Sequence, residues 1–256
     1  MNNKKTKQNK FYIYGKNVVK EQLDLDNLKI KKVLIVKKTA DNKQIEEIIK
    51  KAKKQSISVE YISQNEADNK SEKSNHQGVL ALIQKFKYKT YPEWQQENEE
   101  KENQVVLILD KIEDVGNFGA ILRSAAAFGA SAVFVLNHNQ APVNGTVFKT
   151  SAGNLSKVNI VEVSNINQTI EKLQKDGFWI YALDMLEGQK ENKLWDQKFD
   201  KKTAFILGSE ADGVSQKVLE NSDFIISVPM QKTVESLNVA TTASLCLYEY
   251  KKQFDK

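Results

Sequence analysis

Short apolar segments alternate with helical segments from residue 104 to residue 256, and this alternation most constrains the fold. The segments expected to form strands are 105–109, 132–136, 158–163, 178–183, 203–207 and 224–228. Helical stretches separate them, and a closing helix is expected over 239–252. Apolar strands separated by helices are typical of an α/β fold with a parallel sheet and helices on both faces. Ligands of such sheets bind beyond the carboxyl ends of the strands.

The preceding part of the chain predicts a second, smaller α/β domain over residues 11–85. Residues 1–10 are rich in lysine and asparagine and are expected to form a disordered basic tail. Residues 86–103 contain Pro92 and a polar, acidic run, so we expect a linker between the two domains. A larger domain then spans 104–256. Within 11–85 the pattern predicts one amphipathic helix and three strands, at 45–54, 32–36, 57–62 and 78–83.

Composition narrows the class of protein without fixing its function. The net charge of +5 favours an anionic partner such as nucleic acid, although solubility alone explains a modest positive charge equally well. The single cysteine, Cys246, excludes a disulfide within the chain and a cysteine-based zinc site, and no metal is expected. No apolar run approaches the length that spans a bilayer, and residues 1–10 lack the apolar core of a signal peptide. We therefore expect a soluble, cytoplasmic protein without a membrane partner.

Arg123 is the only arginine among 38 cationic side chains, the others being lysine. Arginine presents a planar fork that grips a phosphate or carboxylate at two points, whereas lysine is a compact point charge. In the segment NFGAILR, Asn117 is expected to cap a helix on which Gly119 and Arg123 share a face. Small neighbours keep that face open to a ligand backbone, although close helix packing also explains small residues. We interpret Arg123 as a functional, anion-binding residue.

Two further segments follow predicted strands. Gly208 begins GSEADG, in which two glycines allow close backbone approach and Glu210 offers an acid for hydroxyl or ammonium groups. Val228 begins VPM, which precedes ESLNVAT and the closing helix. Ser236 or Asn238 would cap that helix, and by itself capping is the simpler interpretation. Because the carboxyl ends of parallel strands share one edge, the three segments are expected to converge on one site.

Taken in order, N-x-G-x-x-x-R, G-x-E-x-x-G and P-M…S-L-N resemble the SpoU (TrmH-like) branch of the SPOUT RNA 2′-O-ribose methyltransferases. The front domain fits this resemblance. Its segments YGKNVV, from Tyr14, and HQGV, from His76, resemble the substrate-binding domain of the RlmB type, which itself is similar to a ribosomal RNA-binding protein. The sequence departs from the family pattern at Val115, Lys232 and Ala240, beside the key residues rather than on them. The resemblance covers nearly the whole chain.

The resemblance implies a catalytic domain with a deep trefoil knot that binds S-adenosylmethionine. By motif position, Gly208, Val228 and Leu237 would hold this cofactor, largely through backbone groups. The family forms homodimers whose active site draws on both subunits, and the RlmB type methylates a guanosine of large-subunit (23S) rRNA. The family's catalytic polar positions match Asn117, Arg123, Glu210, Ser236 and Asn238.

The implied reaction is attack of a ribose 2′-hydroxyl on the sulfonium methyl group, in which positioning supplies much of the barrier reduction. An arginine side chain keeps its positive charge in proteins, so we expect Arg123 to hold the target phosphate and stabilise the developing alkoxide. Two alternatives remain open: a tRNA target, and a non-catalytic RNA-binding or ribosome-assembly protein that keeps the fold. Candidate phosphate contacts of the front domain are Lys29, Lys31, Lys32, Lys37 and Lys38.

Overall fold

The computed structural model describes residues 11–25, 28–84, 86–184, 192–209, 211–231, 233–234 and 236–254. Among these residues, no helix combines the length and the apolar character needed to cross a membrane. The chain divides into two compact units, one formed by residues up to Lys87 with Val143–Lys149, the other by Tyr88–Pro142 and Thr150–Lys256. Each unit has its own sheet and its own buried cluster.

The first unit contains a four-stranded mixed sheet with helices packed on it. Its elements are β1 (Phe11–Tyr14), α1 (Lys16–Asp24), β2 (Ile30–Val36), η1 (Lys37–Thr39), α2 (Lys43–Lys54), β3 (Ser58–Ile62), α3 (Gln64–Lys70) and β4 (Val79–Ile83). The strand order is β1-β4-β2-β3, with β4 antiparallel to β1 and β2, and β2 parallel to β3. The three predicted strands and the amphipathic helix are confirmed, and β1, α1 and α3 join them.

The two front motifs noted in the sequence lie together in this unit. The Gln77 side-chain oxygen accepts a hydrogen bond of 3.0 Å from the Lys16 backbone, at the first residue of α1. The buried His76 ring accepts the Gly78 N–H through Nδ1 at 3.0 Å, so its Nε2 carries the proton and donates to Asp68 at 3.0 Å. His76 therefore holds the turn before β4 and is a structural residue rather than a catalytic base.

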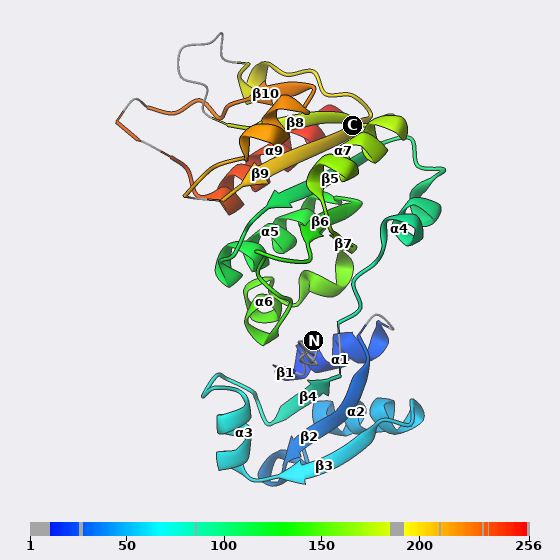
Figure 1. Cartoon of the computed structure of the whole chain (residues 1–256). Helices are drawn as coiled ribbons and strands as arrows, with labels where there is room; N and C mark the ends of the chain where they lie inside the picture. Colours follow the sequence, from blue (N-terminus) through cyan, green and yellow to red (C-terminus); the bar gives the residue numbers. More distant parts are fainter. Residues whose placement is uncertain are drawn as a thin grey trace, which may run out of the picture. The chain divides into compact units, whose positions relative to one another are not determined.

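The second unit contains a six-stranded sheet in which every pair is parallel, in the order β10-β8-β9-β5-β6-β7 (Figure 1). The strands are β5 (Gln104–Asp110), β6 (Ala132–Leu136), β7 (Ile160–Val163), β8 (Trp179–Leu183), β9 (Lys202–Gly208) and β10 (Phe224–Ile226). The helices are α4 (Tyr91–Asn98), α5 (Val115–Phe128), α7 (Ile166–Lys175), α8 (Gln216–Glu220) and α9 (Val239–Phe254), with short turns η2 (Asn154–Lys157) and η3 (Leu194–Asp196). A further helix, α6 (Gly145–Thr150), belongs to the first unit except for its last residue. The predicted parallel α/β fold is confirmed.

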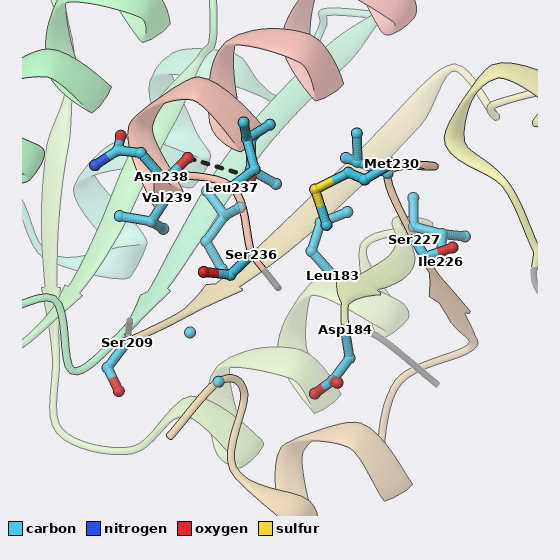
Figure 2. A pocket seen from close by; sticks show the side chains of 15 residues that line it. Leu183, Asp184, Ser209, Ile226, Ser227, Met230, Ser236, Leu237, Asn238 and Val239 are labelled. Carbon is cyan, nitrogen blue, oxygen red and sulfur yellow. Dashed lines mark hydrogen bonds between the residues drawn. The ribbon is translucent and has the colours of Figure 1, made fainter. Parts of the chain in front are cut away.

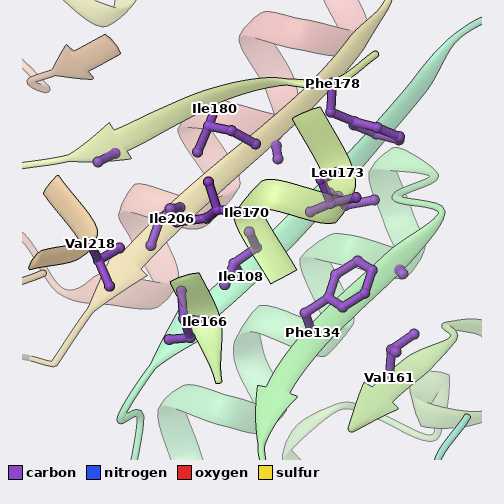
Figure 3. Close-up of a cluster of buried hydrophobic side chains, with 14 of the residues drawn as sticks. Ile108, Phe134, Val161, Ile166, Ile170, Leu173, Phe178, Ile180, Ile206 and Val218 are labelled. Carbon is purple, nitrogen blue, oxygen red and sulfur yellow. The ribbon is translucent and has the colours of Figure 1, made fainter. Parts of the chain in front are cut away.

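Alternate residues of the central strands face opposite sides of this sheet, as strand geometry requires. On one face Ile108, Phe134 and Ile206 pack with Ile170 and Leu173 of α7 in a buried cluster (Figure 3). The other face is covered by α5 and α9, which pack against each other and against β5, β6 and β9 (Figure 1). Strands buried on both faces explain why the sequence shows continuous apolar runs.

A packed helix, α4, occupies Tyr91–Asn98 within the stretch 86–103, where we expected a linker. Thr90 caps α4, and its side chain and that of Glu93 form a reciprocal capping box. Trp94 is buried in the core of the second unit, and its ring meets that of Phe134 edge-on at 5.0 Å. The polar, acidic residues of this stretch cover the outer side of a helix that buries two aromatic rings, Tyr91 and Trp94.

Candidate active site

A cavity of about 550 Å³ lies at the carboxyl ends of β8, β9 and β10 (Figure 2). Its walls are the segments that follow these three strands, together with the first residues of α9. The lining residues are Leu183, Asp184, Leu207, Gly208, Ser209, Gly213, Ile226, Ser227, Val228, Met230, Ser236, Leu237, Asn238, Val239 and Thr242. Ligand sites of open parallel sheets lie at this edge, so the second and third motif segments converge as expected.

Gly208 occupies a point where the chain folds back on itself too closely for any side chain. A Cβ atom at Gly208 would lie 1.9 Å from the carbonyl carbon of Gly213 and 2.2 Å from the nitrogen of Val214. The returning loop is closed by a hydrogen bond of 3.0 Å from the Gly213 N–H to the Ser209 carbonyl. This crossing brings backbone rather than side chains to the cavity wall.

A buried carboxyl group anchors the chain just beyond this loop. Asp110, at the end of β5, accepts hydrogen bonds from the backbone and the hydroxyl of Ser215, at 3.0 and 2.6 Å. Charge-assisted hydrogen bonds of this kind are roughly twice as strong as neutral ones. They fix the segment that leads from the glycine loop into α8. We did not anticipate this role for Asp110 from the sequence, although an acid directly after an apolar strand was visible there.

Asp114, and not Asn117, caps α5. The Asp114 carboxylate accepts the Asn117 backbone N–H at 2.7 Å, and the helix begins at Val115. Both residue types are good N-caps, and the expectation that Asn117 caps the helix was wrong. The correction places Asn117 in the first turn of the helix, where its side chain is available for a long-range contact.

That contact joins the first motif segment to the third. The Asn238 side-chain amide donates to the Asn117 side-chain oxygen at 2.8 Å. The Asn238 oxygen accepts the backbone N–H groups of Ala240 and Thr241, at 3.0 and 3.3 Å, and so caps α9. One side chain therefore starts a helix and links it to α5. Ser124 and Ser244 continue the link between the two helices through hydroxyl groups 2.7 Å apart.

The structure brings most of the expected site residues together. Those on the cavity wall are Gly208, Val228, Ser236, Leu237 and Asn238. Asn117 is joined to them through Asn238. Arg123 is exposed further along α5 and lines neither this cavity nor the one beside it. Glu210 lies outside the described residues.

A second, smaller cavity of about 290 Å³ adjoins the first. The two share Ser209 and Val239, and Asn117 lines the smaller one together with Glu113 and Asp212. Its wall is formed by the loop after β5, the start of α5 and the loop after β9. A reactant in one cavity would therefore face a reactant in the other across the Asn117–Asn238 pair.

The described lining of the larger cavity holds a single acidic or basic side chain, that of Asp184. Burial raises the pKa of the Cys246 thiol, which makes it a poor nucleophile. His138 is exposed and bonded to its neighbour Asn137, at 2.7 Å, outside the lining. Within the described ranges, no group of three or more His, Cys, Asp or Glu side chains could hold a metal ion. The site is suited to holding and orienting reactants rather than to attacking them.

The match to known families covers both units of the chain. Residues 104–248 match the SpoU rRNA Methylase family, and residues 12–89 match the RNA 2′-O ribose methyltransferase substrate-binding family. An uncharacterized tRNA/rRNA methyltransferase of Borreliella burgdorferi is 38% identical over 86% of this chain and 96% of its own length. A Staphylococcus aureus protein assigned to the TrmH family of tRNA/rRNA methyltransferases is 35% identical over 95% of this chain and 96% of its own.

Solved structures show the same fold. An rRNA methyltransferase from Sinorhizobium meliloti, with AdoMet bound, superposes with a TM-score of 0.83 at 20% identity, covering 97% of this chain and 89% of that one. The SpoU methyltransferase AviRb from Streptomyces viridochromogenes, in complex with AdoMet, gives 0.81 at 20% identity, over 99% and 94% of the two chains. Fold and family matches thus define an RNA methyltransferase, with a cavity at the strand ends. The chain belongs to the SpoU (TrmH) family, as the sequence motifs indicated, and the family uses S-adenosylmethionine.

The cavity fits that cofactor. Its volume is within the range of about 300–1,000 Å³ typical of small-molecule sites. Apolar side chains such as Leu183, Ile226 and Leu237 offer a surface for an adenine ring, and the crowded Gly208 crossing presents backbone groups for its polar edge. Asp184 is a lining residue that the motifs did not point to. Its position directly after an apolar strand is the signal that would have found it.

Proposed function

We propose that this protein transfers a methyl group from S-adenosylmethionine to a ribose 2′-hydroxyl of RNA, most specifically to a guanosine of large-subunit (23S) rRNA. The observation that carries the proposal is the meeting of the second and third motif segments around one cavity, to which the first segment is joined by the hydrogen bond between Asn238 and Asn117. The match of the front unit to a substrate-binding family supports a macromolecular substrate.

The chain's own residues would bind and orient. S-adenosylmethionine supplies an electrophilic methyl group when bound, and Gly208, Val228 and Leu237 would hold it from the cavity wall. The acceptor ribose would lie beside the smaller cavity. The ribose would be oriented by the polar residues Asn117, Ser236 and Asn238 and, by motif position, Glu210.

Arg123 would act on the acceptor rather than on the cofactor, because it lies outside the cavity and is exposed on α5. Its guanidinium, held on a regular helix, would grip an RNA phosphate at two points and stabilise negative charge on the attacking oxygen. Among the described residues Arg123 has no ion-pair partner, which leaves its fork available to RNA.

We further propose a homodimer and a trefoil knot in the catalytic unit. The outer side of α9 exposes Leu245 and Tyr248, at 36% and 51% of their surfaces, and Tyr248 meets Phe128 of α5 at 6.2 Å. Exposed apolar side chains on neighbouring helices suit a second copy, which would complete the site around Arg123. The close crossing at Gly208 supports a chain threaded tightly at the cofactor cavity, as the knot requires.

An rRNA target is favoured over tRNA by the front unit. The tRNA-modifying TrmH/SpoU enzyme of A. aeolicus covers 63% of this chain with a TM-score of 0.53, whereas the S. meliloti rRNA methyltransferase covers 97%. Both curated relatives are named for tRNA and rRNA together, so tRNA is the second candidate. Of the front-unit lysines expected to contact phosphate, Lys32 is paired with Glu60 at 2.6 Å, which leaves Lys29, Lys31, Lys37 and Lys38. Either RNA target places the protein in the cytoplasm.

Mapping ribose methylation in total RNA from cells that lack the gene tests this function. We expect the loss of one 2′-O-methylguanosine in large-subunit rRNA and its return on complementation. An unchanged profile, together with no binding of S-adenosylmethionine by the folded protein in calorimetry, would favour the non-catalytic ribosome-assembly alternative. Loss of a ribose methylation in tRNA instead would show that tRNA is the substrate, and the proposed reaction would be unchanged.

A further inference from the structure

Asp184 has a fixed backbone at the carboxyl end of β8. Its N–H donates to the Ile226 carbonyl at 3.1 Å, which continues the β8–β10 pairing one residue past the strand. The side chain is half-buried and lines the larger cavity, well separated from Asn238 in Figure 2. One carboxylate oxygen would lie 3.5 Å from a Cβ atom placed on Gly213, so the carboxylate sits against the glycine loop.

The chemistry of the cavity makes this carboxylate unusual. The other described lining residues are apolar, hydroxyl, amide or glycine residues. Within the described part of the chain, Asp184 forms no ion pair with a lysine, histidine or arginine. A carboxylate in a partly apolar cavity is costly unless a cation or hydrogen-bond donors compensate it. Because no cation of the described residues pairs with Asp184, the ligand is the natural source of positive charge.

S-adenosylmethionine carries a sulfonium and an ammonium group against one carboxylate, and is therefore a net cation. We propose that Asp184 is the counterion of this cofactor and selects it through its positive charge. The proposal rests on S-adenosylmethionine as the cofactor but not on the identity of the RNA. Acidic residues at strand ends also bind ribose hydroxyls in nucleotide-binding folds, and that alternative makes a different prediction.

Calorimetry with three related ligands tests the proposal. S-adenosylmethionine has both cationic centres, S-adenosylhomocysteine has the ammonium only, and 5′-methylthioadenosine has neither but keeps the adenine and ribose. Asp184→Asn keeps the side-chain shape and an acceptor oxygen while removing the charge. We expect this variant to bind S-adenosylmethionine about tenfold more weakly and 5′-methylthioadenosine with unchanged affinity. Added salt should weaken the wild-type affinity for S-adenosylmethionine more than that of the variant.

Glu171→Gln is the matched control, because it removes one exposed carboxylate from α7, outside the cavity lining. It should bind all three ligands like the wild type. Retained binding of 5′-methylthioadenosine by Asp184→Asn shows that its cavity is intact. A loss for S-adenosylhomocysteine as well places the contact at the ammonium, and no such loss places it at the sulfonium; both support the counterion.

Equal losses for all three ligands would mean a ribose contact and overturn the proposal, as would unchanged affinity for S-adenosylmethionine. A wild-type protein that binds S-adenosylmethionine but leaves RNA unmethylated would contradict the proposed function. It would not affect the proposal that Asp184 is the counterion of the cofactor. The two failures are therefore distinguishable.

Discussion

The larger cavity, where we propose that the cofactor binds, and the outer face of the α5–α9 helix pair are built in opposite ways. The cavity is defined within one chain: the Gly208 crossing, the Asp110–Ser215 anchor and the Asn238 cap fix its walls. The helix face presents Arg123, Leu245 and Tyr248 to solvent. The difference teaches that cofactor binding should be a property of the single chain, whereas turnover should depend on what covers the helix face, RNA or a second copy.

Gly208→Ala should have the largest effect on the cavity, because it disrupts the wall at the chain crossing. The added Cβ would meet backbone at 1.9 Å, so the crossing must shift, and we expect affinity for S-adenosylmethionine to fall about 100-fold in calorimetry. Gly129→Ala is the control: its φ of +75° strains alanine, but its Cβ meets nothing within 4 Å. The control should lose about 1–2 kcal/mol of stability without losing affinity. If both variants bound S-adenosylmethionine with equal affinity, the chain crossing at Gly208 would not be part of the cofactor site.

Arg123→Lys should separate turnover from cofactor binding. We expect methyl transfer to fall about 100-fold, because lysine cannot form the two-point grip, while affinity for S-adenosylmethionine stays the same. Single-turnover assays on rRNA fragments, with Arg123→Ala beside them, give the measurement. If the lysine variant retained most methyl transfer and only the alanine variant lost it, the positive charge of Arg123 would matter and its two-point grip would not.

Leu245→Glu tests whether a second copy covers the helix face. A charge placed there should weaken self-association roughly tenfold or more, as measured by light scattering across a concentration series. The cofactor affinity per chain should persist and turnover should fall. Tyr61→Glu, at an exposed aromatic residue of the first unit, should leave the oligomeric state unchanged. A monomeric wild type would overturn the homodimer.

The smallest expected effect is at the hydrogen bond that joins the two regions. Asn238→Ala should cost about 1–2 kcal/mol of unfolding free energy through loss of the α9 cap, and Asn117→Ala should cost less. A double-mutant cycle should give a coupling of about 1 kcal/mol between them. Additive costs would show that the bond contributes nothing to joining α5 and α9.

Much of the fold was predictable because it depends on local pattern. The apolar runs that became β5, β6, β8 and β9 are continuous, as expected for strands buried on both faces. The helix α4 escaped prediction because its polar residues outnumber the two rings, Tyr91 and Trp94, that it buries. Burial of so few side chains depends on the tertiary partner, Phe134, which lies far along the chain.

The site was predictable in its motifs but not in its detailed contacts. Gly208, Val228 and Leu237 were located by motif position, and they line one cavity. The choice of Asp114 over Asn117 as the cap depended on where α5 begins, and two cap-forming residues three positions apart leave that start ambiguous. Asp184 belongs to no motif, and only the sheet order places it beside the glycine loop.

Transfer of labelled methyl groups from S-adenosylmethionine to unmodified large-subunit rRNA, followed by digestion to nucleosides, tests the central claim most directly. We predict that the wild-type protein places the label in 2′-O-methylguanosine. Arg123→Lys should leave it near background although the variant still binds the cofactor. Label on a base, or no transfer to any RNA by protein that binds S-adenosylmethionine, would contradict ribose methylation at this cavity.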